Sequence, residues 1–450
     1  MLTDMARSTM FGFVQKACDI VTPSRFSTSV SRRGTAFYDS SRDKPITELA
    51  EFGGAVATLQ ADPVIAEIFG LENVPRLAIQ FVYNTCELLD NGIDFPLAFG
   101  TTWNALVTES SNPHWRFAAV ANLSNFSFTG DMANLGHGVS VQGRSFDHLR
   151  QELGFDQADL DVLAEDWSAG GAASSYVLVV ETSQPKTPAN IILSSDGAAY
   201  PLASKALLAM RLLGIGAPHF GRMFLKRPAA FNTGIGGRSY AGFTIWWPGA
   251  RYNLNETMIP EIRQLIDTLI AVEKDLETSA RHIGLALRSF SSMFDRLMHQ
   301  GEDCVIDSIT ALEALWKLDS ELAFRLAFRT ASLLGTCDDL REQVFDTLRT
   351  YYRIRSKIVH GTTLQPSEFA LVQNDEPLRE IVRKTLRAFI HLLANPGDWT
   401  VGRLANDPDA ALLHSEKRFA LQQAMAILPV GEPLRAGTVG CFSKRIKLIH

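Results

Sequence analysis

Apolar side chains recur at intervals of three and four residues over most of the segment from residue 255 to residue 393. Ile262, Ile266 and Leu269 belong to one such stripe, and Pro260 just before it suits the first turn of a helix. The same period predicts further helices at about 279–299, 303–318, 320–334, 338–359 and 376–393. Because the connections between them are short, we expect antiparallel neighbours in an all-α bundle.

The segment from residue 44 to residue 250 has a different pattern. One helix is predicted from Pro201 to Leu213, with Gly214 where a C-terminal cap belongs. Short apolar runs typical of strands lie between glycines and prolines, at 115–123, 176–181, 191–193 and 240–247. This half is therefore predicted to be a mixed α/β or α+β domain.

Together these patterns predict an α+β protein of several domains. We expect an N-terminal arm over residues 1–43, where Ser, Thr and Arg are frequent, and a mixed α/β domain over residues 44–250. The all-α bundle is expected to take residues 255–395, and a C-terminal tail over 396–450 is expected to hold one helix. The arm faintly resembles a transit peptide, but its acidic residues weaken that interpretation.

Composition and charge narrow the class of protein. Of the 450 residues, 46% are hydrophobic and 20% are charged, which is ordinary for a globular chain and excludes disorder. The formal net charge is −6, so any binding of nucleic acid needs a local basic patch. The five cysteines are scattered and odd in number, which argues against a disulfide framework. No apolar run approaches the length of a membrane span, so we expect a cytoplasmic protein with no membrane partner.

Most short motifs of catalysis are missing from the chain. It contains no G-x-x-x-x-G-K-[ST], no H-E-x-x-H and no G-x-S-x-G, and its ten histidines show no metal-ligand spacing. A loose glycine-rich segment at 234–242 allows a phosphate cradle, although a hairpin or bulge is the more common interpretation. The sequence therefore predicts no metal and no cofactor.

The helix predicted at 338–359 is the exception. Its apolar stripe includes Arg355, and a guanidinium in such a position is costly unless it is paired or used. His360 follows about 140° further round the helix, so the two converge only through the reach of the arginine, through distortion at Gly361, or across two subunits. The segment from Thr347 to Ser367 contains four basic residues and no acidic residue, a pattern typical of a local anion-binding surface. These are Arg349, Arg353, Arg355 and Lys357.

Glu313 lies at the edge of the apolar stripe of the helix predicted at 303–318. A partly buried carboxylate needs a cation, and Arg355 and Arg329 are both candidates, so we expect an ion pair that positions an arginine. A glutamate that reaches water is an equally good interpretation. Tyr351 and Tyr352 are able to stack on bases, but aromatic residues at this spacing more often belong to a core.

The segment YYRIRSKIVHG, residues 351–361, resembles the R-x4-6-H motif of HEPN domains, with Arg355 and His360 as its ends. The preceding segments also resemble, in order, the elements of the ApeA-like HEPN group. These segments are ALRSFSSMF at 286–294, DSITALEALW at 307–316 and AFRLAFRTASLLG at 323–335. The resemblance covers residues 260–393, under a third of the chain.

A HEPN domain implies an all-helical homodimer in which two motifs face each other across a cleft. Many such domains are metal-independent endoribonucleases that act as bacterial toxins or antiviral defence effectors. The resemblance implies that His360 acts as general acid or base while the 2'-hydroxyl of the RNA attacks the adjacent phosphate, and that Arg355 stabilises the developing charge. Ser356 and Glu313 are the expected supporting residues. Arg349, Arg353 and Lys357 are expected to bind the RNA.

The sequence is also compatible with other functions. The motif can belong to an inactive member that serves RNA binding or dimerisation, because a fold does not determine a function. A small-molecule enzyme can instead lie in the N-terminal half, where a deep polar pocket among residues 100–250 would favour it. By analogy with multidomain effectors, that half is expected to sense a trigger or to hold the helical domain inactive.

Overall fold

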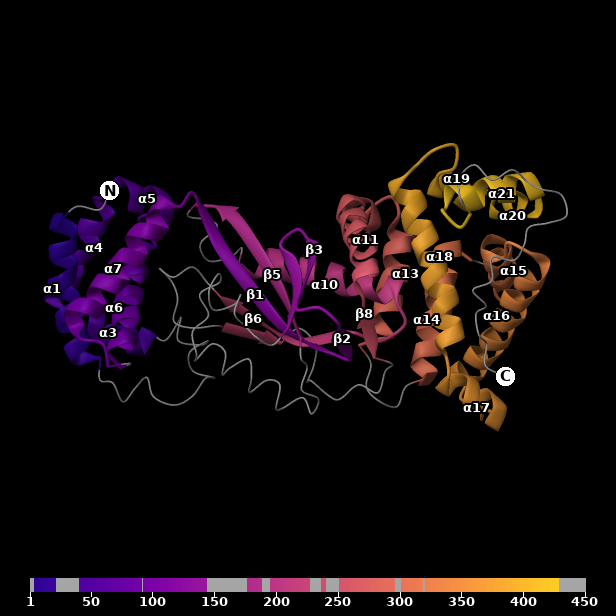
Figure 1. The fold of residues 1–450 in the computed structure, drawn as a ribbon, viewed down its shortest axis with the longest axis horizontal. Coiled ribbons are helices and arrows are strands. Elements are labelled where there is room, and N and C mark those ends of the chain that lie inside the picture. The colour runs from indigo at the N-terminus through magenta and orange to yellow at the C-terminus, as the bar shows by residue number, and fades with distance from the viewer. Residues whose placement is uncertain are drawn as a thin grey trace. The chain divides into compact units, whose positions relative to one another are not determined.

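A computed structural model of the protein divides into two compact units. Their helices and strands are labelled in Figure 1. Unit 1 combines residues 1–124, 130–204 and 220–244, and unit 2 combines 125–129, 205–219 and 245–450. Two short segments of the first half thus belong to the second unit, which a single boundary near residue 250 does not predict. The structure describes residues 4–21, 40–90, 92–143, 176–187, 195–226, 236–239, 251–295, 301–318 and 320–428.

The first part of unit 1 is helical. Its helix α1 buries Met10, Phe13, Val14 and Ala17 and packs on α4 and α6. These side chains, spaced three and four apart, give the segment an apolar face, so the predicted N-terminal arm is wrong for residues 4–20. The helices are α1 (Asp4–Ile20), α3 (Ser40–Thr47), α4 (Ala50–Gln60), α5 (Pro63–Phe69), α6 (Val74–Asp90) and α7 (Phe95–Ser111).

A six-stranded sheet of order β3-β4-β5-β1-β6-β7 completes unit 1. Antiparallel pairs join β3 to β4, β4 to β5, β5 to β1 and β6 to β7. The strands are β1 (His114–Ser124), β3 (Met132–Gly136), β4 (Val139–Gly143), β5 (Tyr176–Pro185), β6 (His219–Lys226) and β7 (Gly236–Ser239). The strands predicted at 115–123 and 176–181 are confirmed, whereas those predicted at 191–193 and 240–247 lie outside the described residues.

The relation of helices to strands in unit 1 decides the fold class. The six helices described above precede the sheet, and its described strand pairs, β3–β4, β4–β5, β5–β1 and β6–β7, are antiparallel. Parallel α/β sheets require crossover helices between successive strands. The mixed α+β class is therefore confirmed.

Unit 2 contains a small parallel ladder between β2 (Phe126–Phe128) and β8 (Tyr252–Leu254). The helix α10 (Ser195–Leu213) ends beside this ladder, and Gly214 and Gly216 follow it. A Cβ added at Gly214 would lie 2.5 Å from the Tyr252 ring, and one at Gly216 would lie 2.7 Å from the Tyr252 backbone. Glycine at both positions therefore permits the close approach of β8.

The helices of unit 2 follow the apolar periodicity of the sequence. The helix predicted at 279–299 ends early, at Ser292, and those predicted at 303–318, 320–334, 338–359 and 376–393 are present within a few residues. The elements of this part of unit 2 are the 3-10 turn η5 (Glu256–Met258), α11 (Ile259–Ala271), α12 (Glu273–Glu277), α13 (Arg281–Ser292), α14 (Gly301–Trp316), α15 (Leu322–Leu334), α16 (Asp338–Val359), α17 (Pro366–Gln373) and α18 (Glu376–Ala394).

The described part of the predicted C-terminal tail is folded onto unit 2. Leu404, Leu412 and Leu421 are buried, and the Gln422 side chain donates to backbone carbonyls at the end of α15. Its helices are α19 (Val401–Asn406), α20 (Pro408–Leu413) and α21 (Ser415–Ala424). The prediction of a tail with one helix is wrong here, because three short helices pack on the bundle with apolar faces, α20 and α21 on α15 and α19 on α18.

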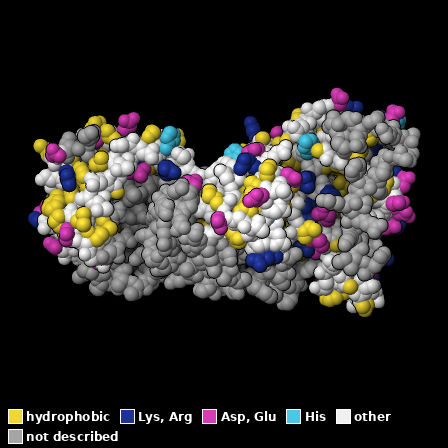
Figure 2. Space-filling view, viewed as in Figure 1, with side chains coloured by type: hydrophobic (Ala, Val, Ile, Leu, Met, Phe, Trp, Pro, Cys, Tyr) yellow, Lys and Arg dark blue, Asp and Glu magenta, His cyan; other side chains and the backbone are white. Residues whose placement is uncertain are grey.

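The surface carries charges of both signs. Figure 2 shows Lys and Arg side chains interspersed with Asp and Glu on the face in view. No helix among the described residues is long and apolar enough to cross a membrane.

Candidate functional site

The helix α16 carries both ends of the R-x4-H motif. It packs on α14, α15 and α18 and buries Val344, Leu348, Tyr351 and Ile354. Val359, the last residue of the helix, is by contrast 51% exposed. The last turn of α16 therefore leaves the core, and Arg355 lies where the buried face ends.

The C-terminus of α16 presents His360 to solvent. His360 is the cap residue, and its N–H donates to the Ser356 carbonyl at 3.1 Å. Gly361 has φ of 66°, a conformation that strains other residues, and the N–H of Thr362 donates back to the Lys357 carbonyl at 2.8 Å. Glycine thus ends the helix directly after the histidine.

Arg355 faces α14, where it meets Glu313. Its Nη2 lies 3.8 Å from Glu313 Oε2, and the side chains are 26% and 20% exposed. Tyr352 donates from its hydroxyl to Glu313 Oε1 at 3.1 Å, and its ring centroid lies 6.0 Å from the Arg355 guanidinium. The expected ion pair of Glu313 is therefore present with Arg355, whereas Arg329 binds Asp409 at 2.6 Å.

The pairing leaves hydrogen-bonding capacity on Arg355. At 3.8 Å the contact with Glu313 is an ion pair that exceeds hydrogen-bond length, and the buried Nε has no hydrogen-bond partner. Burial and the Glu313 carboxylate together raise the pKa of Tyr352, so its hydroxyl stays protonated and occupies one carboxylate oxygen. The guanidinium is held in place and is still able to bind an anion.

His360 belongs to a different face of α16 from Arg355. At 3.6 residues per turn, Phe345, Arg349, Tyr352, Ser356 and His360 lie within about 80° of one another. Arg349 and His360 are exposed, and the other three are half-buried. Both motif residues are described, and neither a hydrogen bond nor an ion pair joins them.

Aromatic rings extend this face beyond α16. The Arg349 guanidinium lies 5.6 Å from the Phe345 ring, which packs edge-on against Phe324 at 6.0 Å. Phe324 is 55% exposed and stacks on Phe328 with an angle of 4° between the rings. This cluster was not predicted from the sequence. Phe324 and Phe328 are four residues apart, a spacing that places two side chains on one face of a helix.

Glu368 is a second residue that the sequence analysis missed. It is 6% exposed, and both of its carboxylate oxygens accept from Lys357 Nζ at 2.8 Å. The Arg353 Nε lies 3.7 Å from the same carboxylate, and hydrogen bonding by Lys357 lowers the pKa of Glu368. Glu368, which follows Ser367 directly, thus compensates one positive charge of the basic segment: it holds Lys357 closely, and Arg353, whose side chain is 65% exposed, only at its edge.

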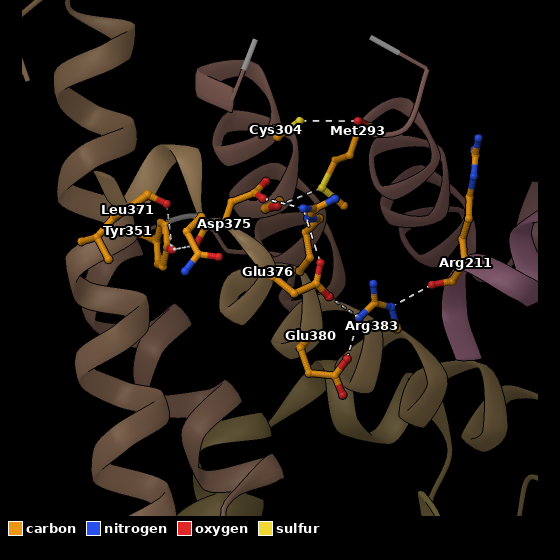
Figure 3. A network of polar contacts seen from close by, with 12 residues as sticks. Arg211, Met293, Cys304, Tyr351, Leu371, Asp375, Glu376, Glu380 and Arg383 are labelled. Carbon is orange, nitrogen blue, oxygen red and sulfur yellow. Dashed lines mark hydrogen bonds and ion pairs between the residues drawn. The ribbon is translucent and has the colours of Figure 1, made fainter. Parts of the chain in front are cut away.

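A buried polar network anchors α18 elsewhere in unit 2 (Figure 3). Arg383 is 2% exposed and donates to the Arg211 carbonyl at 2.8 Å, to Glu376 at 3.1 Å and to Glu380 at 2.5 Å. Tyr351 belongs to the same view, and its hydroxyl donates to backbone carbonyls near the end of α17. Tyr351 is therefore a core residue, which leaves only Tyr352 beside the motif.

The described residues contain no group of three or more His, Cys, Asp or Glu side chains arranged to hold a metal ion. Comparisons with protein-family models, with curated proteins and with solved structures find no match to this chain. The candidate site is therefore defined by the geometry of α14, α16 and α17.

Proposed function

We propose that the end of α16 is the centre of a metal-independent endoribonuclease of HEPN type. One observation carries the proposal: Arg355 is half-buried, positioned by Glu313 at 3.8 Å without a hydrogen bond, and five residues before an exposed His360. A positioned guanidinium with spare donors suits a phosphate, and an exposed imidazole suits proton transfer near neutral pH.

In the proposed reaction His360 takes the proton of an RNA 2'-hydroxyl. The 2'-oxygen then forms a bond to the adjacent phosphorus while the bond from phosphorus to the 5'-oxygen breaks, and an imidazolium returns a proton to the leaving oxygen. Arg355 stabilises the negative charge that develops on the phosphoryl oxygens. The products are a 2',3'-cyclic phosphate and a 5'-hydroxyl, with no cofactor.

Arg355 and His360 lie about 140° apart around the helix, and this angle decides whether one copy of the chain can bring both side chains to one phosphate. A single phosphate meets both side chains if the long arginine reaches round the helix, or if a second copy of the chain supplies one of the two. We favour a homodimer through unit 2, because the two groups face different directions from one helix.

The face of α16 next to His360 suits a single RNA strand. Phe345, Arg349, Tyr352 and Ser356 precede His360 on this face over about 22 Å at 1.5 Å rise per residue. Aromatic rings stack on bases without regard to sequence, and arginine binds the phosphates between them. Ser356 is then placed to contact the phosphate nearest His360.

An inactive RNA-binding or dimerisation module is the second candidate. The contacts of Glu368 with Lys357 and Arg353 favour it, because this carboxylate offsets one positive charge of the proposed RNA-binding set and holds Lys357 in an ion pair. In either case the biological setting that we propose is a cytoplasmic toxin or antiviral effector.

The test is incubation of the purified protein with an end-labelled RNA in excess EDTA, beside an all-deoxy strand of the same sequence. We expect cleavage of the RNA only, loss of cleavage in His360→Ala, and retention in His414→Ala, a control histidine that is also exposed in unit 2. Cleavage that survives His360→Ala would move the chemistry elsewhere. Binding of RNA without cleavage by the unaltered protein would favour the inactive module.

A further inference from the structure

Two cysteines from distant parts of the sequence meet in the helical part of unit 1. Cys18 lies near the end of α1 and Cys86 near the end of α6, and their sulfur atoms are 3.0 Å apart. Both are free thiols, Cys86 is 4% exposed and Cys18 is half-buried. The separation is about 1 Å longer than the bond of ~2.05 Å that joins two disulfide sulfurs.

The packing of α1 on α6 brings the thiols together. Ala17 and Val14, on the face that carries Cys18 inward, are buried against the neighbouring helices. On the outer side, Lys16 of α1 pairs with Glu51 of α4. The helix is thus held from two sides with Cys18 directed at α6, so only a small movement of two side chains separates thiol contact from a covalent bond.

We propose that Cys18 and Cys86 are a disulfide-forming pair that fastens α1 to α6 under oxidising conditions. The oxidant is hydrogen peroxide. The Cys18 sulfur, which is the more accessible one, attacks a peroxide oxygen, the O–O bond breaks, and sulfenic acid and water result. The Cys86 sulfur then attacks the Cys18 sulfur, the S–S bond forms, and the departing hydroxide takes the Cys86 proton to become water. Two thiols are oxidised and one peroxide is reduced to two waters.

The environment of the thiols sets the rate of this reaction. The hydrogen bond with Cys86 and burial both raise the pKa of the Cys18 thiol, so little thiolate is present at neutral pH. Attack on peroxide is correspondingly slow. The pair therefore acts as a structural fastening that forms over a long exposure to oxidant, and it does not act as a rapid sensor.

The bond would close a long loop of chain between the two helices. A cross-link of this kind removes conformations from the unfolded chain, and the effect grows with the length of the loop. In the reduced protein α1 is held by side-chain packing and by the Lys16–Glu51 pair, whereas in the oxidised protein it cannot leave the bundle. Oxidation is thus expected to stabilise the N-terminal helix of unit 1 selectively.

The test uses the full chain, reduced and then treated with hydrogen peroxide, with remaining thiols alkylated under denaturing conditions before tryptic digestion. We expect a linked pair of peptides, 17–25 and 77–116, lighter than their sum by two hydrogen atoms. Cys304, whose thiol donates to the Met293 carbonyl at 3.4 Å, is the matched control and is expected to remain alkylated on peptide 297–317. Two alkylated cysteines, or a sulfinic acid on Cys18 without a link, would overturn the proposal.

A thermal measurement tests the stabilising role separately. We expect the oxidised protein to melt at least about 5 °C above the reduced protein, and we expect this difference to be clearly smaller in Cys18→Ser, where only the disulfide of Cys337 still responds to oxidation. The variant is needed as a reference because Cys337 is disulfide-bonded and also responds to reductant. An equal shift in Cys18→Ser would assign the effect to another bond and refute the fastening of α1.

Discussion

Two arginines on helices of unit 2 occupy comparable positions along their apolar faces and have opposite surroundings. Arg383 of α18 is 2% exposed and makes hydrogen bonds to one backbone carbonyl and two carboxylates. Arg355 of α16 is 26% exposed and has a single carboxylate at 3.8 Å with no hydrogen bond. The first arginine is tied into the fold by three hydrogen bonds, although its Nη2 has no partner, and the second lies beside the surface without a hydrogen bond from its guanidinium.

The difference shows two ways in which a protein accommodates an arginine on the apolar face of a helix. Burying a guanidinium is tolerated where hydrogen bonds compensate for lost water, and such a residue then contributes to the uniqueness of the packing. A guanidinium that keeps part of its water and only one distant partner contributes little to stability. The surroundings of Arg355 are therefore those expected for a residue that binds an anion.

The largest expected effect is on the fold, from Arg383→Met. Removal of the buried guanidinium takes three hydrogen bonds from the Arg211 carbonyl, Glu376 and Glu380, which is expected to cost about 3 kcal/mol although Arg379 and Lys384 remain beside the two carboxylates. Hydrogen exchange of the α18 amides under mild urea measures this cost. Arg387→Met is the matched control, because Arg387 is exposed one turn later on the same helix and is expected to cost at most about 0.5 kcal/mol. Equal effects of the two changes would refute the anchoring role of Arg383.

The second effect is on cleavage, from Arg355→Ala. If Arg355 binds the phosphate as proposed, loss of its guanidinium is expected to slow single-turnover RNA cleavage by roughly 10²–10³-fold. Stability is expected to change by less than about 1 kcal/mol, because the ion pair is half-exposed. Glu313→Gln, which weakens only the positioning of Arg355, is expected to slow cleavage by about tenfold, or about 1.4 kcal/mol. If Arg355→Ala instead destabilises α16 as much as Arg383→Met destabilises α18, the two arginines have the same structural role.

The smallest effect concerns the cations that Glu368 neutralises. In a His360→Ala background, Glu368→Gln is expected to release Lys357 and Arg353 and to strengthen RNA binding several-fold. The slope of log affinity against log salt is expected to steepen by about one to two. Glu342→Gln, an exposed glutamate near the other end of α16, serves as the control for net charge. An equal gain from both changes would show that only overall charge had been measured.

The contribution of the Glu368–Lys357 ion pair to stability is expected to depend on pH. Hydrogen bonding by Lys357 places the pKa of Glu368 in the folded protein below its ordinary value of 4.5. The contribution of the pair to stability is therefore present above that value and is lost as pH falls through the lower folded pKa. Glu368→Gln is expected to flatten this acid limb of the stability profile, measured by unfolding from pH 6 downward.

Local periodicity accounted for much of the secondary structure. The helices from 303 to 393 and the strands at 115–123 and 176–181 are present because their apolar side chains repeat at 3.6 or 2 residues, and this pattern is visible within a short window. The helix at residues 4–20 has the same kind of pattern at Met10, Phe13 and Val14. It was missed because its Ser, Thr and Arg content suggested an arm, which shows that composition is weaker evidence than spacing.

The candidate site was predicted only in part. The sequence placed Arg355, His360 and Glu313 on two helices, and it permitted the ion pair with either of two arginines. It did not predict Glu368, because the turn after Gly361 returns α17 to α16 and brings together residues eleven apart. A periodicity argument has no access to such a contact.

The sequence by itself determined where helices and strands form and which residues carry charge, because these depend on neighbours within a few positions. Tertiary structure decided which charges on different helices are compensated: Lys357 of α16 by Glu368 of α17, and Arg355 of α16 only loosely by Glu313 of α14. It also decided that Cys18 meets Cys86. The physical reason is that Coulomb energies and desolvation depend on distance and burial in three dimensions, which the order of residues does not specify.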